Sequence, residues 1–218
     1  MATGENLLQQ VRQYILMTYV SLPLILLTFS LFVGVALGNP GFLLFFLGQL
    51  LVLFITWLVQ KIPFMKYISQ PSSDILQLVP SEPVISGAVT APTYWMTFMS
   101  FFLAYITTNA GFVYTMGSEK KSSIEYENRR GKATMIMITS FVMFFAFATL
   151  RLFYQDLETP LGLILAVAIG IPAGAGWYYL SNSAGIRHAD VFGIVTQIIP
   201  KEAAGGGPKT CYYVASAN

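Results

Sequence analysis

The side chains that most often carry catalysis or bind metals are scarce in this chain. His188 is the only histidine and Cys211 the only cysteine among 218 residues. One copy therefore cannot build a multi-histidine or cysteine-based metal site, or an internal disulfide. Arg187 and Asp190 beside the histidine indicate a surface position, and no Ser/His/Asp or Cys/His arrangement can be assembled. We predict that the protein is not an enzyme and has no cofactor and no metal.

Three polar side chains, Thr107, Thr108 and Asn109, lie in the middle of a long apolar run. Polar groups at membrane depth either line a water path or hydrogen-bond to a neighbouring helix, and such hydrogen bonds are a common device of helix packing in membranes. We favour polar interhelical contacts for these residues. A pore stays open as an alternative, in which the same three side chains would face water.

The runs that must position these residues are long and apolar. Five runs contain no Asp, Glu, Lys, Arg or His, at 14–37, 41–60, 94–117, 133–150 and 160–180. A helix needs about 20 apolar residues to cross a hydrocarbon core about 30 Å thick. With 55% hydrophobic and 10% charged residues, the chain has too few charges to cover a soluble globule. We predict an all-α fold, a polytopic transmembrane helical bundle of five spans within residues 1–180.

Two further segments are expected outside the spans. Residues 61–93 contain five prolines, and proline at this density excludes a long helix or a central strand. We expect a proline-rich extramembrane loop there. Residues 181–218 are expected to form a C-terminal interfacial segment and a tail.

Small residues recur every four positions in the fifth run, and a shorter pattern of the same kind occurs in the first. Small residues at this spacing form a groove that lets another helix approach closely. We expect the groove to receive a helix of the same chain in preference to a second molecule, although both remain open. The expected helix-packing residues are Gly162, Ala166, Gly170 and Gly174, together with Gly34 and Gly38.

A charged segment joins the third and fourth runs. Ser122 and Glu125 fit a capping box, which predicts a helix that begins there and continues into the fourth run. The formal net charge of +2 and the absence of a basic stripe argue against nucleic-acid binding. These juxtamembrane basic residues are expected to anchor the topology and to meet anionic lipid. They are Lys120, Lys121, Arg129, Arg130 and Lys132.

Loop charge predicts the orientation, because basic loops are normally retained in the cytoplasm. The side that carries the N-terminus has four basic residues, namely Arg12, Lys61, Lys66 and Arg151. The other side, with the charged segment and the tail, has the remaining eight of the twelve. We predict the N-terminus out and the C-terminus in. Pro23 lies inside the first run and should bend that helix.

Four stretches resemble multi-pass membrane proteins of nucleocytoplasmic large DNA viruses. They are residues 93–110 (TYWMTFMSFFLAYITTNA), 127–133 (ENRRGKA), 192–199 and 208–214 (PKTCYYV). The resemblance implies a protein of the virion inner membrane, beneath an icosahedral capsid, that anchors the shell to the membrane or helps shape the membrane. It implies no catalytic or ligand-binding residues.

These observations predict a non-enzymatic structural or assembly component that links a viral inner membrane to the capsid. Its expected partners are the lipid bilayer and other membrane or capsid proteins, in a homo- or hetero-oligomer. Two alternatives remain open: a pore or transporter subunit, and an accessory subunit of a larger membrane complex.

Overall fold

A computed structural model describes residues 2–65, 70–71, 88–89, 91–115, 123–154, 159–185 and 191. Over these residues the chain is mostly helical, with short turns and a two-residue antiparallel pairing of β1 (Gln70–Pro71) with β2 (Ala88–Val89). The long helices are α1 (Ala2–Ala36), α2 (Pro40–Gln60), α4 (Tyr94–Thr115), α5 (Ser123–Thr149) and α6 (Pro160–Ser183). A short π-helix, η1 (Leu150–Tyr154), continues α5.

Five helices are long and apolar enough to cross a membrane, which confirms the predicted all-α bundle of five spans. The candidate spans are Thr18–Ala36, Pro40–Gln60, Tyr94–Thr115, Arg130–Phe153 and Pro160–Ser183. The protein is therefore an integral, multi-pass membrane protein. Helix α5 begins at Ser123, inside the charged segment, where the capping-box pattern predicts a helix start.

Helices α2 and α6 begin with the same local chemistry. The side chain of Asn39 accepts a hydrogen bond of 2.9 Å from the backbone N–H two residues on. Thr159 does the same, at 2.9 Å, for the N–H three residues on. Each cap is followed by a proline, Pro40 or Pro160, whose fixed φ suits the first helical position and whose missing N–H leaves no donor unsatisfied. Both helix starts are thus defined by capping side chains outside the apolar runs.

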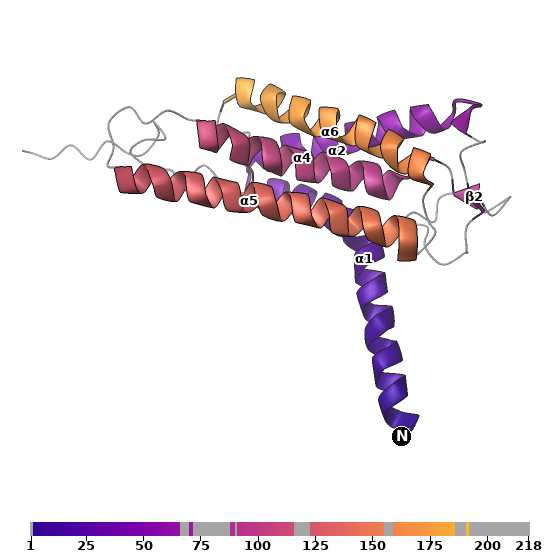
Figure 1. The fold of residues 1–218 in the computed structure, drawn as a ribbon. Helices are drawn as coiled ribbons and strands as arrows, with labels where there is room; N and C mark the ends of the chain where they lie inside the picture. Colours follow the sequence, from indigo (N-terminus) through magenta and orange to yellow (C-terminus); the bar gives the residue numbers. More distant parts are fainter. Residues whose placement is uncertain are drawn as a thin grey trace, which may run out of the picture.

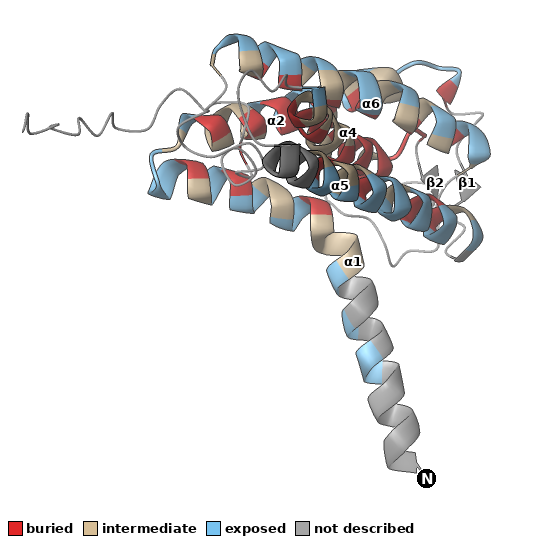
Figure 2. Ribbon diagram, turned by 60° about the vertical axis from the view of Figure 1, so that its left-hand side comes forward, coloured by how far each residue is buried: buried red, intermediate tan, exposed pale blue. Residues whose placement is uncertain are grey.

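Helix α4 lies at the centre of the bundle, in contact with α2, α5, α6 and α1 (Figures 1 and 2). Of its span 67% is buried, whereas no other span exceeds 28%. The surrounding helices turn large apolar side chains outward, among them Phe32, Met135 and Phe153. The outer surface of the bundle therefore suits lipid, and α4 is shielded from it.

Two clusters of buried side chains lie along α4. The cluster near the beginning of α4 joins Trp95 and Met99 to Phe147 of α5. The second joins Tyr105 to Phe45 of α2, with ring centroids 4.9 Å apart, and to Tyr178 of α6, at 5.5 Å. Aromatic rings thus make up much of the contact between the central helix and its neighbours.

Helix α1 has two halves with different surroundings. Its C-terminal half packs along α2, whereas its N-terminal half projects sideways from the bundle (Figure 1). Pro23 lies inside this helix, close to its midpoint. Proline removes one hydrogen bond of the helix and its ring pushes away the carbonyl four residues earlier, so a bend at this place is expected.

Candidate functional site

A hydrogen bond from α4 completes the bend in α1. Because Pro23 has no N–H, the carbonyl of Tyr19, four residues earlier, loses its usual partner within the helix. The indole N–H of Trp95 donates to this carbonyl oxygen at 3.1 Å. The ring of Tyr19 also packs on the Trp95 ring, with centroids 4.5 Å apart. The beginning of α4 therefore holds α1 at the point where the proline weakens it.

Arg151 completes this cluster from η1. Its guanidinium carbon lies 5.1 Å from the centroid of the Trp95 ring, and the residue is 4% exposed. Phe147, one turn earlier, meets the same indole edge-on at 5.3 Å. The indole ring can stabilise this buried cation through its π face.

The small residues of α6 face α4. Gly162, Ala166, Gly170 and Gly174 are all buried. A Cβ atom added at Gly170 would lie 2.6 Å from the Thr97 carbonyl oxygen and 2.6 Å from the Ser100 Cβ atom. One added at Gly174 would meet the carbonyl oxygen of Phe101. The two backbones are thus closer than any side chain at these glycines permits, and the groove is occupied by a helix of the same chain.

The glycines at the end of α1 have two different roles. A Cβ atom at Gly34 would lie 2.8 Å from the Leu43 side chain of α2, so this position packs the first hairpin. Gly38 lies beyond the end of α1, has a φ of +58°, and would carry a Cβ with nothing within 4 Å. Gly38 therefore serves the left-handed backbone of the turn and not the helix packing that its spacing from Gly34 predicts.

Gly48 of α2 makes room for an indole from α6. An added Cβ atom would meet Nε1 of Trp177 and would lie 2.8 Å from the Cε2 atom of the same ring. The indole N–H donates to the Leu44 carbonyl oxygen at 2.9 Å. The absent side chain thus allows α6 to reach the backbone of α2.

A buried serine and a buried glutamine join α1 to α2. Ser30 Oγ lies 2.8 Å from the Leu27 carbonyl oxygen and 2.7 Å from Oε1 of Gln49. A hydroxyl has one proton and can donate it to only one of these acceptors. If the amide of Gln49 is turned over, its Nε2 donates to Ser30 while Ser30 donates to Leu27. We assign this orientation because it also gives a partner to the Nε2 atom, a buried donor otherwise without one.

The three polar residues in the middle of α4 differ in burial. Asn109 has no exposed surface, whereas Thr107 and Thr108 are half-buried. The Thr108 hydroxyl donates to the Ala104 carbonyl oxygen of its own helix at 2.7 Å. The hydroxyl of Thr108 thus bonds within α4, whereas the sequence predicts a contact with a neighbouring helix.

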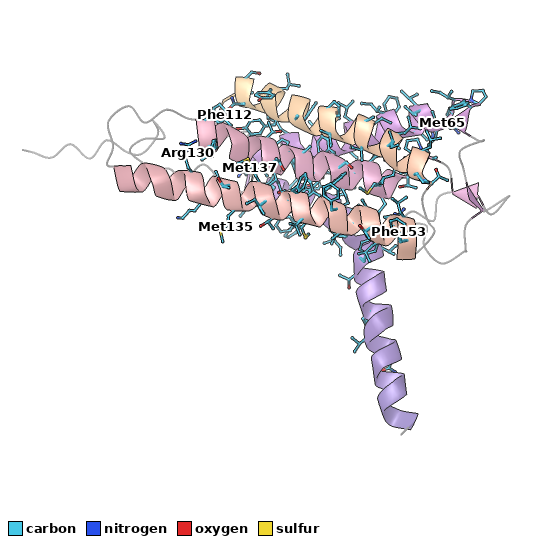
Figure 3. The ribbon with its side chains drawn as sticks, in the orientation of Figure 1. Met65, Phe112, Arg130, Met135, Met137 and Phe153 are labelled. Atoms are coloured by element: carbon cyan, nitrogen blue, oxygen red, sulfur yellow. The ribbon has the colours of Figure 1, made fainter. Side chains whose placement is uncertain are left out.

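At the opposite end of the bundle, Arg130 joins α5 to α4. Its guanidinium carbon lies 4.2 Å from the centroid of the Tyr114 ring, and it donates a short hydrogen bond to the Tyr114 hydroxyl. Figure 3 shows Arg130 beside the end of α4, near Phe112. Lys132 is exposed, whereas Lys120, Lys121 and the side chain of Arg129 lie outside the described residues.

Sequence reasoning missed the contacts that tie the helices together through backbone carbonyls. Pro23 carries a usable signal, since it frees the carbonyl of residue 19, but nothing in the sequence names Trp95 as the donor. Gly48 has no partner at four-residue spacing, so it forms no recognisable groove. Among the described residues, no three His, Cys, Asp or Glu side chains are grouped so as to hold a metal ion. His188, Cys211 and most of the 61–93 loop and the tail lie outside the described residues.

The chain was also compared with known proteins. No family model, no curated protein and no solved structure matches it.

Proposed function

We propose that this protein is a non-enzymatic structural or assembly component of a membrane, and that it links the inner membrane of a large DNA virus to the capsid. Five apolar helices support the membrane location. The similarity of residues 93–110, 127–133, 192–199 and 208–214 to viral membrane proteins supports the viral setting. A scaffold of this kind needs a stable bundle that presents its loops and tail to other proteins.

The packing around α4 is the observation that carries the structural role. Gly170 and Gly174 bring α6 against the α4 backbone, and the indole of Trp95 ties α4 to α1 by a hydrogen bond to a backbone carbonyl. A transporter needs helices that can part around a polar path. Contacts between backbones oppose such a separation, because every one of them must be broken when the helices move. The bundle therefore suits a rigid anchor.

The basic residues give the anchor a proposed direction. With the N-terminus out and the C-terminus in, the charged segment around Lys120 and Lys121 and the tail lie on the cytoplasmic side. A capsid protein made in the cytosol can reach them there. Partners of this kind, or further copies of the chain, are the proposed contacts of the loops and the tail.

Removal of lipid from virus particles tests the link to the capsid. In particles stripped with a nonionic detergent, the protein is expected to remain with the capsid after the lipid has been extracted. A Lys120→Gln, Lys121→Gln variant is expected to lower the retained fraction, whereas Lys61→Gln, on the other side of the membrane, serves as the matched control. Complete release of the unaltered protein with the lipid would show that it does not hold the capsid.

Flux through proteoliposomes tests the absence of a transport function. Purified protein in sealed vesicles is expected to give no selective, saturable solute flux. A flux that Asn109→Leu abolishes would contradict the structural role and would favour a pore or transporter subunit, since that change removes the buried amide of α4.

A further inference from the structure

The first half of α1 does not run parallel to the other long helices (Figure 1). Residues 2–17, here called the N-terminal arm, precede the candidate span that begins at Thr18. The arm runs across the direction of the other helices (Figure 1). Because those helices cross the membrane, a segment that runs across their direction lies closer to the membrane plane than they do.

The contacts next to the arm place it at a membrane surface. Tyr19 follows the arm directly and packs on Trp95, the second residue of α4. The same cluster includes Arg151 of η1, at the end of the fourth span. Helix α4 begins and the fourth span ends at this level, so the arm leaves the bundle where the hydrocarbon core meets the headgroups.

The residues of the arm are divided between two sides of the helix. At about 100° per residue, its apolar positions from 7 to 15 fall within a sector of about 120°. They are Leu7, Leu8, Val11, Tyr14 and Ile15, and the opposite sector holds Glu5, Gln9, Arg12 and Gln13. Of the described side chains, Val11 is 47% and Tyr14 71% exposed, so the described part of the protein does not cover the apolar side. A helix with these properties binds in the interface of a membrane.

The position of Pro23 indicates which side of the arm faces the hydrocarbon. A proline ring pushes away the preceding turn, so the helix bends away from the proline. The proline lies on the convex side of the bend, and the concave side is opposite. Tyr14 lies nine residues before Pro23, about 180° away around the helix, and Val11 lies about 120° away. Arg12 and Glu5 lie within about 20° of the proline direction. Of the apolar positions, Leu7, Val11 and Tyr14 thus share the concave side, toward which the rest of α1 enters the membrane, whereas Glu5 and Arg12 lie on the proline side.

We infer that the N-terminal arm is an in-plane helix that binds the surface of the protein's own membrane, with Val11 and Tyr14 inserted at the acyl boundary. Glu5 and Arg12 balance each other, so burial of apolar surface and not attraction to anionic lipid holds the arm. The bend at Pro23 and its hydrogen bond from Trp95 fix the arm at the correct angle. This membrane contact does not depend on the viral role proposed above.

Spin labels on the full-length protein in phosphatidylcholine vesicles test this arrangement. In a Cys211→Ser background, single cysteines replace Val11 and Tyr14 on the apolar side, and Gln9 and Gln13 as matched controls. Collisions with oxygen, which concentrates in lipid, and with a water-soluble nickel chelate report the surroundings of each label. The ratio of oxygen to nickel collisions is expected to be several-fold higher on the apolar side than at the controls.

Two results would overturn the inference. Equal ratios at all four positions would show an arm that stands in water. Labels at 11 and 14 that are shielded from both reagents would show that protein, such as a second copy of the arm, covers this side. Because a cysteine variant could disturb the bundle, Pro23→Ala supplies an independent check: a straightened α1 is expected to carry position 11 into water and to abolish the difference from position 9.

Discussion

Gly174→Ala is expected to weaken the contact between α6 and α4. The added Cβ atom would press on the carbonyl oxygen of Phe101 and would lie 3.0 Å from the Cβ atom of Ala104. The carbonyl belongs to a helix backbone and cannot turn aside, so only separation of the two helices relieves the overlap. A gap of about 0.5–1 Å loses a quarter to a half of the dispersion attraction between facing atoms. Overpacking of this kind costs about 1–3 kcal/mol.

Gly176→Ala is the matched control, because an added Cβ there has nothing within 4 Å. Both changes replace glycine by alanine in the same helix, so the gain in helix propensity, about 1 kcal/mol, cancels in the comparison. The free energy of unfolding is expected to be about 1–3 kcal/mol lower for Gly174→Ala. Reversible unfolding in mixed micelles, followed by tryptophan fluorescence, measures this difference. Stabilities equal within about 0.5 kcal/mol would refute the close backbone contact.

Three further changes test the hydrogen bonds between helices. Gly48→Ala is expected to displace the indole of Trp177, to shift its fluorescence and to cost about 1–3 kcal/mol, with a much smaller cost in a Trp177→Phe background. Trp95→Phe should cost about 1 kcal/mol in the same unfolding assay, but less in a Pro23→Ala background, where the helix regains its own N–H donor. An unchanged cost would contradict the role of the proline. Gln49→Leu is expected to change stability by less than about 1 kcal/mol, since the serine that bonds this amide keeps a backbone acceptor; a larger loss would count against that proton assignment.

The apolar runs were sufficient to predict the five spans, because the length of a charge-free helix is set by the thickness of the bilayer. The small residues of α6 also lie together on the face that packs against α4. Their spacing of four is sufficient to predict this, because it places residues on one face of any helix. The bend of α1 could be anticipated from Pro23. In each case the property depends on residues that are close together in the sequence.

The contacts between distant residues could not be predicted in the same way. Trp177 lies against Gly48, and Trp95 donates to the carbonyl of Tyr19, because the helices meet at particular heights and rotations. In a membrane every face of a span is apolar, so the hydrophobic pattern determines neither the height nor the rotation at which two helices meet. Arg151 shows the same limit: its position at a span end does not indicate that its guanidinium lies against the ring of Trp95.

The arrangement of this protein in virus particles is the most direct test of its proposed role. Averaged electron cryo-tomography of the particle membrane is expected to show five-helix bundles in an array that repeats with the capsid units, with density that joins the bundles to the shell on one side. Isolated bundles beside cofactor-bearing subunits, or bundles with no repeat and no connection to the shell, would contradict an anchor between membrane and capsid.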